Sequence, residues 1–136
     1  ASYNADALLQ ICKVKWDALE WDGKKTDWES VESDFKRLVG SANKLNQVIR
    51  SEDELGEDFL LGHVFFLEAV PFLHQFLQSY SRSPSSFLFT AKGAWREPIE
   101  KLWRLSLNPL LKEYLSGLDN KARMRIMKKL KEAFKP

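Results

Sequence analysis

The longest regular hydrophobic pattern in the chain runs through residues 27–50. Its apolar residues recur at steps of three and four positions, which places them on one side of an α-helix. These residues are Val31, Phe35, Leu38, Ala42, Leu45 and Ile49. Thr26 and Glu29 have the spacing of a capping box, which predicts that the helix starts near Asp27. The pattern therefore predicts one long helix whose apolar stripe is buried in a core.

A shorter amphipathic helix is predicted over residues 5–19, ahead of a break in the pattern at 20–26. The side expected to face the core carries Leu8, Ile11, Cys12, Lys15 and Leu19, with Trp16 beside them. After the long helix, residues 51–58 read SEDELGED and hold five carboxylates in eight positions. Mutual repulsion between these charges favours solvent, so we expect a loop or a frayed helix end that divides the chain roughly in half.

The second half of the chain begins with the strongly apolar residues 59–80. Pro71 lacks a backbone N–H and crowds the turn before it, so it is expected to end one helix or open another. Residues 81–86, SRSPSS, consist mostly of turn-forming residues and predict a linker. A short extended piece is expected only in the segment SSFLFTA at 85–91.

Further helices are expected after residue 94. The first covers residues 95–105, and the last opens at Asp119. Between them, Asn108 suits an N-cap and Pro109 suits the first helical position, which predicts a separate helix that stops at Gly117. No convincing strand pattern or internal repeat accompanies these helices. The predicted fold class is therefore all-α, an irregular bundle of five to seven helices.

The composition supports one packed core. At 136 residues the chain fits a single helical domain spanning 1–136, and 44% hydrophobic with 29% charged residues excludes global disorder and a fibrous repeat. The five Trp and nine Phe residues are large apolar groups, which we expect mainly inside the core instead of on a base-stacking surface. The single Cys12 can form no internal disulfide, and its apolar neighbours predict a small buried residue in a reducing compartment.

Charge and hydropathy narrow the expected partners and location. The 21 basic and 19 acidic residues are too evenly balanced to indicate a polyanionic partner for the whole surface. No apolar run reaches membrane-spanning length, because Glu68, Pro71 and His74 interrupt the longest one. The first residues also lack the order of a signal peptide, so we expect a cytoplasmic protein with no membrane partner.

The sequence offers no catalytic centre of a familiar kind. It contains no GxxxxGK[ST] phosphate-binding loop, so this chain alone is not expected to hydrolyse a nucleotide. Two His and one Cys fall short of the four ligands of a zinc site, and His63 and His74 share a helical face only if Pro71 does not intervene. The carboxylates are better explained by a solvated surface than by acid–base chemistry. We therefore predict no catalytic residue and no metal site.

The closing helix carries the one clear charge pattern. Residues 121–135, KARMRIMKKLKEAFK, hold seven basic residues and one acidic residue. The apolar stripe of this helix consists of Met124, Met127, Leu130 and Phe134. Its basic side could face solvent, contact nucleic-acid phosphates through Arg123, Arg125 and Lys128, or lie on a membrane surface. The stripe favours the first interpretation, because a packed terminal helix needs it in any case.

Residues 42–66 read ANKLNQVIRSEDELGEDFLLGHVFF, and residues 107–115 read LNPLLKEYL, followed by the basic helix. In this order and at this spacing, the two motifs resemble the C-terminal part of McrB-type AAA+ proteins. That family includes the GTP-using motor of a modified-cytosine restriction system and many ATPase relatives. In it, a long helix with an LN pair leads through an acidic loop to a GHSYF-like element and then to a PLLEEYF helix. The resemblance covers about 35–130, and the matching positions are Leu45, Asn46, Gly62, His63, Phe65, Phe66, Pro109, Leu110, Leu111, Glu113, Tyr114 and Leu115.

The resemblance implies roles for particular residues. Gly62 is expected to permit a tight turn out of the acidic loop, and His63 resembles the family residue near the nucleotide-facing edge of the lid. The plain alternative is that the ring of His63 caps a helix. Leu60 and Leu61 stand where the family often has an arginine, so no phosphate-sensing cation carries over, and Val64 replaces the usual serine.

The resemblance implies that the chain is the helical lid of a longer protein driven by a nucleotide. Its partners would be an upstream AAA+ core, neighbouring subunits of a ring, and a nuclease subunit or DNA through the full assembly. ATP or GTP with Mg would bind in the parent protein, whereas this chain would hold no cofactor. Such a lid rotates relative to the core and transmits hydrolysis to a neighbouring subunit. The alternative is a stand-alone helical module that binds nucleic acid or protein through the basic last helix.

Overall fold

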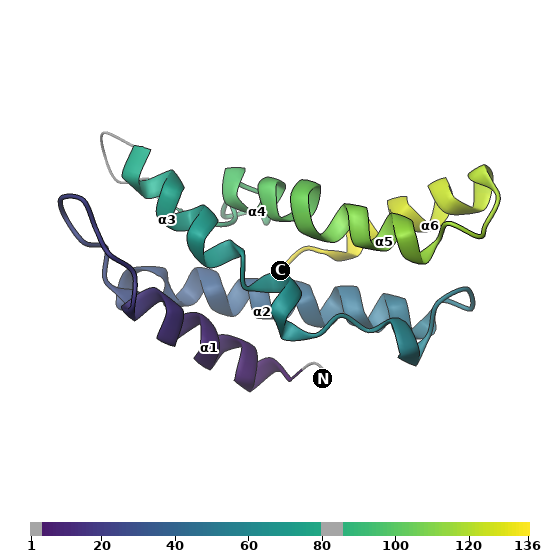
Figure 1. The fold of residues 1–136 in the computed structure, drawn as a ribbon, viewed down its shortest axis with the longest axis horizontal. Helices are drawn as coiled ribbons and strands as arrows, with labels where there is room; N and C mark the ends of the chain where they lie inside the picture. The colour runs from purple at the N-terminus through teal and green to yellow at the C-terminus, as the bar shows by residue number, and fades with distance from the viewer. Residues whose placement is uncertain (1–3, 80–85) are drawn as a thin grey trace.

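The computed structural model describes residues 4–79 and 86–136, and the regular structure in these two ranges is helical (Figure 1). The α-helices of the described residues are α1 (Ala5–Asp17), α2 (Trp28–Ser51), α3 (Ala69–Ser79), α4 (Glu97–Leu102), α5 (Asn108–Tyr114) and α6 (Asn120–Ala133). Two 3-10 segments, η1 (Glu57–Phe59) and η2 (His63–Phe66), lead from α2 to α3. A π-helical segment, η3 (Trp103–Leu107), joins α4 to α5. The prediction of an all-α bundle with five to seven helices is confirmed.

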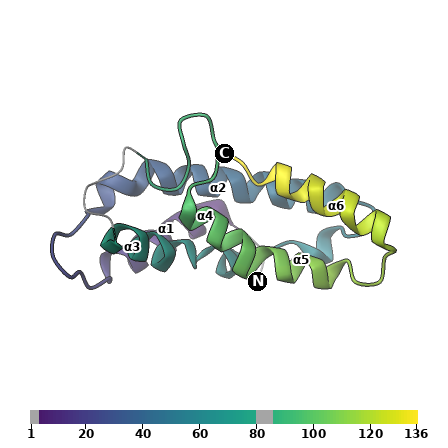
Figure 2. The same ribbon diagram turned by 90° about the horizontal axis from the view of Figure 1, so that it is seen from above.

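Helix α2 is 24 residues long and organises two layers of helices (Figures 1 and 2). In the first layer, α1 packs against the N-terminal half of α2. The second layer contains α4, α5 and α6, of which α6 runs back along α2. Helix α3 rises from the first layer to the second and packs against α4.

The core forms along the side of α2 that the sequence pattern indicated. All six predicted stripe residues, from Val31 to Ile49, are fully buried. The buried residues of α1 are Leu8, Cys12 and Trp16. Of the other residues expected on that side, Ile11 and Leu19 are half-buried and Lys15 is exposed. The buried residues of α1 are four positions apart, so this helix meets the core along a narrower line than predicted.

The aromatic residues fill the interior, as predicted. All five Trp and nine Phe residues lie in the described ranges, and none of them is exposed. Near the end of the chain, the ring of Phe134 stacks on Phe66 and on Trp103, at centroid distances of 6.0 and 6.1 Å. The indole N–H of Trp95 donates to the carbonyl of Phe134 at 2.7 Å. These contacts fix the last turn of the chain to the core.

Helix α2 starts where the sequence predicted, but without the predicted capping box. Its N-cap is Asp27, and no side-chain hydrogen bond caps it. Thr26 instead offers its backbone carbonyl to the indole N–H of Trp16, at 2.9 Å. With Asp27 at the cap, Glu29 stands one residue short of the position from which a capping box closes. The helix start was predicted correctly, and the capping residues were wrong.

The segment from α4 to α5 is one continuous helix, which corrects the prediction of two helices separated at Asn108. Asn108 is not an N-cap, because its backbone N–H bonds to the carbonyl of Trp103, five residues back, in the π-helical turn. Pro109 therefore lies inside a helical rod. A proline in that position lacks a donor and presses on the carbonyl four residues before it, and the wider π turn relieves the contact.

The end of α5 also differs from the prediction. The helix ends at Tyr114, three residues before Gly117. Gly117 does not have the positive φ that would make it a helix stop. The turn that follows leads to α6, whose predicted start is confirmed, since the Asp119 side chain accepts the N–H of Ala122 at 2.8 Å.

The core-facing side of α6 is not the predicted methionine stripe. Ile126, Leu130 and Phe134 are fully buried, whereas Met124 is 65% exposed and Met127 is half-buried. The prediction was right for Leu130 and Phe134. It placed Met124 in the core, where the structure has Ile126 instead. Steps of four residues place the buried set on one line of the helix, facing α2.

The segment between α2 and α4 agrees with the sequence at the positions that the structure describes. Pro71 lies in the first turn of α3, so it opens a helix, where its missing donor is not needed. The predicted linker at 81–86 lies outside the described residues except for Ser86. Phe89 and Trp95 form an isolated antiparallel bridge, which matches the extended piece expected at 85–91. Within the described ranges, no helix has the length and apolar character needed to cross a membrane.

Candidate functional site

The GHVFF element (residues 62–66) follows a backbone position that α2 holds directly. The side chain of Asn46 donates from Nδ2 to the carbonyl of Leu61 at 2.9 Å and accepts the N–H of Leu61 on Oδ1 at 2.8 Å. Asn46 and Leu61 are both buried. A single amide thereby satisfies two backbone groups that would cost free energy if they were buried unpaired. Asn46 therefore fixes the place at which the GHVFF element begins.

The acidic loop that precedes this element is an ordered cap on α2. The N–H of Gly56 bonds to the carbonyl of Ile49 at 2.9 Å, and the φ of Gly56 is +95°, in the left-handed region that favours glycine. Glu52 corrects the prediction of a solvated loop, because it is buried and its Oε2 lies 3.2 Å from Lys129 Nζ on α6. The loop thus contains a structural carboxylate that sequence reasoning missed.

Gly62 and His63 differ from the expectations that the resemblance raised. Gly62 has a φ of −71° and a ψ of 165°, an extended conformation available to any residue, so the tight turn falls at Gly56 instead. His63 begins η2, which has no side-chain cap, so the ring of His63 does not cap this segment. The ring is half-buried, and its Nδ1 has no hydrogen-bond partner among the described residues. The next residue, Val64, is 61% exposed.

The second motif of the sequence packs against the first. Tyr114, from LNPLLKEYL, sets its ring edge-on to Phe59 of η1, at a centroid distance of 4.9 Å. Leu111 and Leu115 of the same motif are fully buried. Burial, to which the carboxylate of Glu113 adds, raises the pKa of the Tyr114 hydroxyl. This ring therefore stays neutral at physiological pH and packs on η1, which follows the acidic loop.

The basic residues predicted as nucleic-acid contacts do not share one side of α6. Along an α-helix, Arg125 and Lys128 lie within about 60° of each other, whereas Arg123 lies on another side. Arg123 is half-buried, and its guanidinium donates to Asn120 Oδ1 at 3.3 Å. Arg125 and Lys128 are exposed. Two neighbouring cations are a small footprint beside the several phosphate contacts that hold DNA-binding proteins on a duplex.

Two polar residues of α2 organise the turn at 87–96, a role that sequence reasoning missed. Asp34 accepts the backbone N–H groups of residues 87 and 88 on Oδ1, at 3.3 and 2.9 Å. Arg37 donates to the carbonyls of residues 89 and 90, at 3.4 and 2.9 Å. These partners lie 52 to 54 residues away in the sequence, so no local pattern indicates them.

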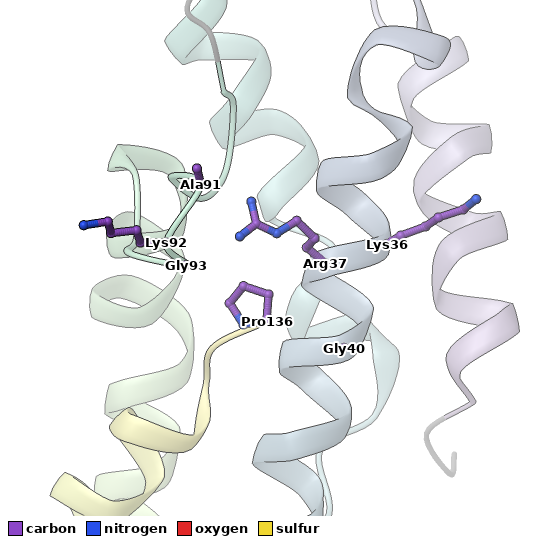
Figure 3. Close-up of a pocket in the computed structure, with 7 residues that line it drawn as sticks. All are labelled: Lys36, Arg37, Gly40, Ala91, Lys92, Gly93 and Pro136. Atoms are coloured by element: carbon purple, nitrogen blue, oxygen red, sulfur yellow. The ribbon is translucent and has the colours of Figure 1, made fainter.

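A hollow of about 420 Å³ lies between α2, this turn and the last residue (Figure 3). Arg37 extends into it, near Pro136, whereas Lys36 and Lys92 point away from it. Because Arg37 already binds backbone carbonyls, the hollow does not gather free charge at one point. We therefore do not assign it as the functional site.

The chemically reactive side chains do not converge. His74, on α3, packs its ring edge-on against Trp21 at a centroid distance of 4.6 Å, whereas His63 lies on η2. Among the described residues, no group of three or more His, Cys, Asp or Glu could hold a metal ion. Cys12 is fully buried, and burial raises the pKa of its thiol to about 12 although nearby Lys15 acts in the opposite direction. Such a thiol is a poor nucleophile.

Comparison with known proteins gives one family match. The family model described as McrB, alpha-helical lid domain, matches residues 37–123, which is more than half of the chain. The matched range contains Asn46, the acidic loop, the GHVFF element and LNPLLKEYL. No curated protein and no solved structure matches the chain.

Proposed function

Because the chain belongs to the family of McrB alpha-helical lid domains, we propose that it closes over a nucleotide held by a phosphate-binding core elsewhere in a longer protein. Movement of the lid would couple hydrolysis of the nucleotide to a neighbouring subunit of a ring. ATP or GTP with Mg would bind mainly to that core, which would provide the groups that contact the phosphates. The sequence pattern supports this division, since the chain contains no GxxxxGK[ST] loop of its own.

The observation that carries the proposal is the anchored position of the GHVFF element. Asn46 binds both backbone groups of Leu61, so the residues that follow leave the core at a fixed place. Phe66 is buried at the end of the element, whereas Val64 is 61% exposed. Directly before Val64, the buried Nδ1 atom of His63 has no partner among the described residues. Buried polar atoms nearly always have a partner, so we expect the ring of His63 to turn outward when the lid meets the core, where this nitrogen gains a partner from the core or the nucleotide.

The residues of this element fit the base or the ribose of a nucleotide better than its phosphates. Directly before the element, Leu60 and Leu61 carry no charge at the positions where a cation would meet a phosphate. Once turned outward, the imidazole of His63 can donate or accept one hydrogen bond at Nδ1, which suits a sugar hydroxyl or a ring nitrogen. The exposed side chain of Val64 adds an apolar surface on which a base would pack. The nucleotide, when bound, would supply the free energy of phosphoanhydride hydrolysis, and this chain would hold and respond to it.

The test uses the longer protein that contains the core. His63→Ala is expected to weaken nucleotide binding about tenfold, because one hydrogen bond to a ligand contributes roughly 1–1.5 kcal/mol. Val64→Asp is expected to slow hydrolysis by disturbing the face that meets the core. Val14→Asp is the matched control, since Val14 is 59% exposed and lies on α1, outside the GHVFF element.

Two results would refute the proposal. One is a complete gene product without a phosphate-binding loop. The other is nucleotide affinity and hydrolysis that stay unchanged in both His63→Ala and Val64→Asp. Circular dichroism of each variant shows that a loss of activity does not come from a loss of fold. The isolated chain is expected to bind neither ATP nor GTP in an equilibrium titration.

A further inference from the structure

A groove between α5 and α6 has a character that neither the core nor the lid role explains. It encloses about 500 Å³ and is lined by Lys112, Ser116, Asn120, Arg123, Met124 and Met127. Lys112 comes from α5 and Ser116 from the turn after it, whereas the other four residues come from α6. The volume falls within the range of about 300–1,000 Å³ that is usual for ligand-binding clefts.

The apolar part of this groove takes no part in packing α6 against the core. That packing uses Ile126, Leu130 and Phe134, which are fully buried. Met124 is 65% exposed, the highest value among the exposed large apolar residues of the described ranges. Met127 beside it is half-buried. Methionine is flexible and polarisable and adapts to different partner surfaces, so this pair forms an apolar floor that is open to contact.

The rim of the groove is basic. Lys112 and Arg123 are its charged lining residues, and neither forms an ion pair with the described part of the chain. Asp119, which precedes α6, uses its carboxylate to cap that helix. Glu113 follows Lys112 in the sequence but does not line the groove. The groove therefore combines an apolar floor with two cations that no ion pair with the described residues holds.

From this combination we infer that the α5–α6 groove docks an acidic, amphipathic peptide segment of a partner protein. An apolar side chain of the segment lies against Met124 and Met127, and its carboxylates pair with Lys112 and Arg123. Opposite charges speed the encounter and fix the register, while burial of the apolar side chain holds the complex together. Duplex DNA fits this groove less well, because it offers no apolar side chain to cover the methionines.

Selection from a library of random peptides against the folded chain tests this inference. The enriched peptides are expected to combine several Asp or Glu residues with an apolar anchor. With one enriched peptide carrying a fluorescent label, Arg123→Glu and Met124→Glu are each expected to weaken binding at least about tenfold. Arg125→Glu is the matched control, because it makes the same charge change about 160° around α6 from Arg123, and it should change the affinity less than about twofold.

Thermal unfolding of each variant shows whether the fold is kept, and Met124→Gln replaces Met124→Glu if the charged variant does not fold. The inference is overturned if no peptide is enriched, if the enriched peptides are not acidic, or if Arg123→Glu and the Met124 variant bind as the original chain does. A labelled DNA duplex serves as a second probe, and duplex binding that both variants abolish would assign the groove to nucleic acid. None of these measurements involves a nucleotide, so their failure is distinct from failure of the lid proposal.

Discussion

Lys129 Nζ on α6 lies 3.2 Å from Glu52 Oε2, at the residue that caps the C-terminal end of α2. Glu52 is only 7% exposed, whereas the side chain of Lys129 is half-exposed. The buried carboxylate therefore depends on this cation more than the cation depends on the carboxylate. The contact ties the last helix to the loop that leads into the GHVFF element.

Lys129→Met should lower the free energy of unfolding by about 1 kcal/mol, because it leaves Glu52 without its cation while solvent screens part of the lost attraction. Lys128→Met is the control, since Lys128 is exposed on the same helix, and it should change stability by less than about 0.5 kcal/mol. Urea denaturation of the two variants measures the difference. Equal midpoints would mean that the pair adds nothing to stability.

Asn46→Ala should cost more, about 3 kcal/mol, because it leaves the N–H and the carbonyl of Leu61 buried without partners. Asn43→Ala is the control on the same helix, where the half-buried Asn43 has no side-chain hydrogen bond to the described residues and alanine favours the helix. Chemical denaturation gives the free energies, and hydrogen exchange at the N–H of Leu61 should become faster in Asn46→Ala alone. A protected Leu61 N–H in that variant would contradict the assignment.

Asn46 also marks the boundary between what the sequence could and could not predict. Helix α2 and its buried stripe follow from periodicity, because apolar residues at helical spacing need no knowledge of what covers them. Nothing in the same pattern indicates that the Asn46 amide meets Leu61, 15 residues further on. The resemblance singled out Asn46, Gly62 and His63 from residue identity alone. The anchoring role of Asn46 and the exposure of Val64 could be recognised only once the path of the loop was known.

The second half of the chain shows where local rules were overridden by packing. Asn108 and Pro109 favour a helix start, yet Leu107 and Leu111 on either side are both fully buried in the core. Keeping both leucines in place requires the helix to pass through the proline, and a π turn allows this. On α6, Met124 and Met127 lie at helical spacing, and so do Ile126 and Leu130. The position of α2 decides that Ile126 and Leu130 are buried.

Gly56 and Gly40 should respond in opposite directions to replacement by alanine. The φ of Gly56 is +95°, where a Cβ atom is strained, so Gly56→Ala should destabilise the fold by about 1 kcal/mol. Gly40 lies inside α2, and a Cβ there would meet nothing within 4 Å outside its own helix, so Gly40→Ala should stabilise by about 0.5–1 kcal/mol. Thermal unfolding of the two variants checks the signs. Two shifts in the same direction would refute this account.

Cys12 should be unreactive in the folded chain and reactive once the chain unfolds. Burial raises the pKa of its thiol from 9.0 to about 12, so the thiolate is scarce at neutral pH, and reaction with a disulfide reagent should be at least about a hundredfold slower than in urea. The stability that the neutral thiol contributes is fully present below about pH 9 and is lost as the pH rises towards 12.

The Cys12→Ala variant isolates this pH effect. The difference in unfolding free energy between the original chain and the variant should stay constant from pH 7 to about pH 9 and then shift in favour of the variant. Paired urea titrations across this range measure the difference. Fast labelling of Cys12 at neutral pH, with the fold intact by circular dichroism, would contradict its burial.

The polar contacts of α2 have a consequence for how the chain is made. Asp34, Asn46 and Glu52 bind groups that lie between 15 and 77 residues later in the sequence. A ribosome releases the N-terminal part first, so α1 and α2 can pair while α6 is still being synthesised. Each later attachment must close a long loop, which costs entropy before any bond is made. The carboxylate of Glu52 therefore stays in solvent during synthesis until Lys129 emerges. The contact between the acidic loop and α6 forms only after α6 has left the exit tunnel.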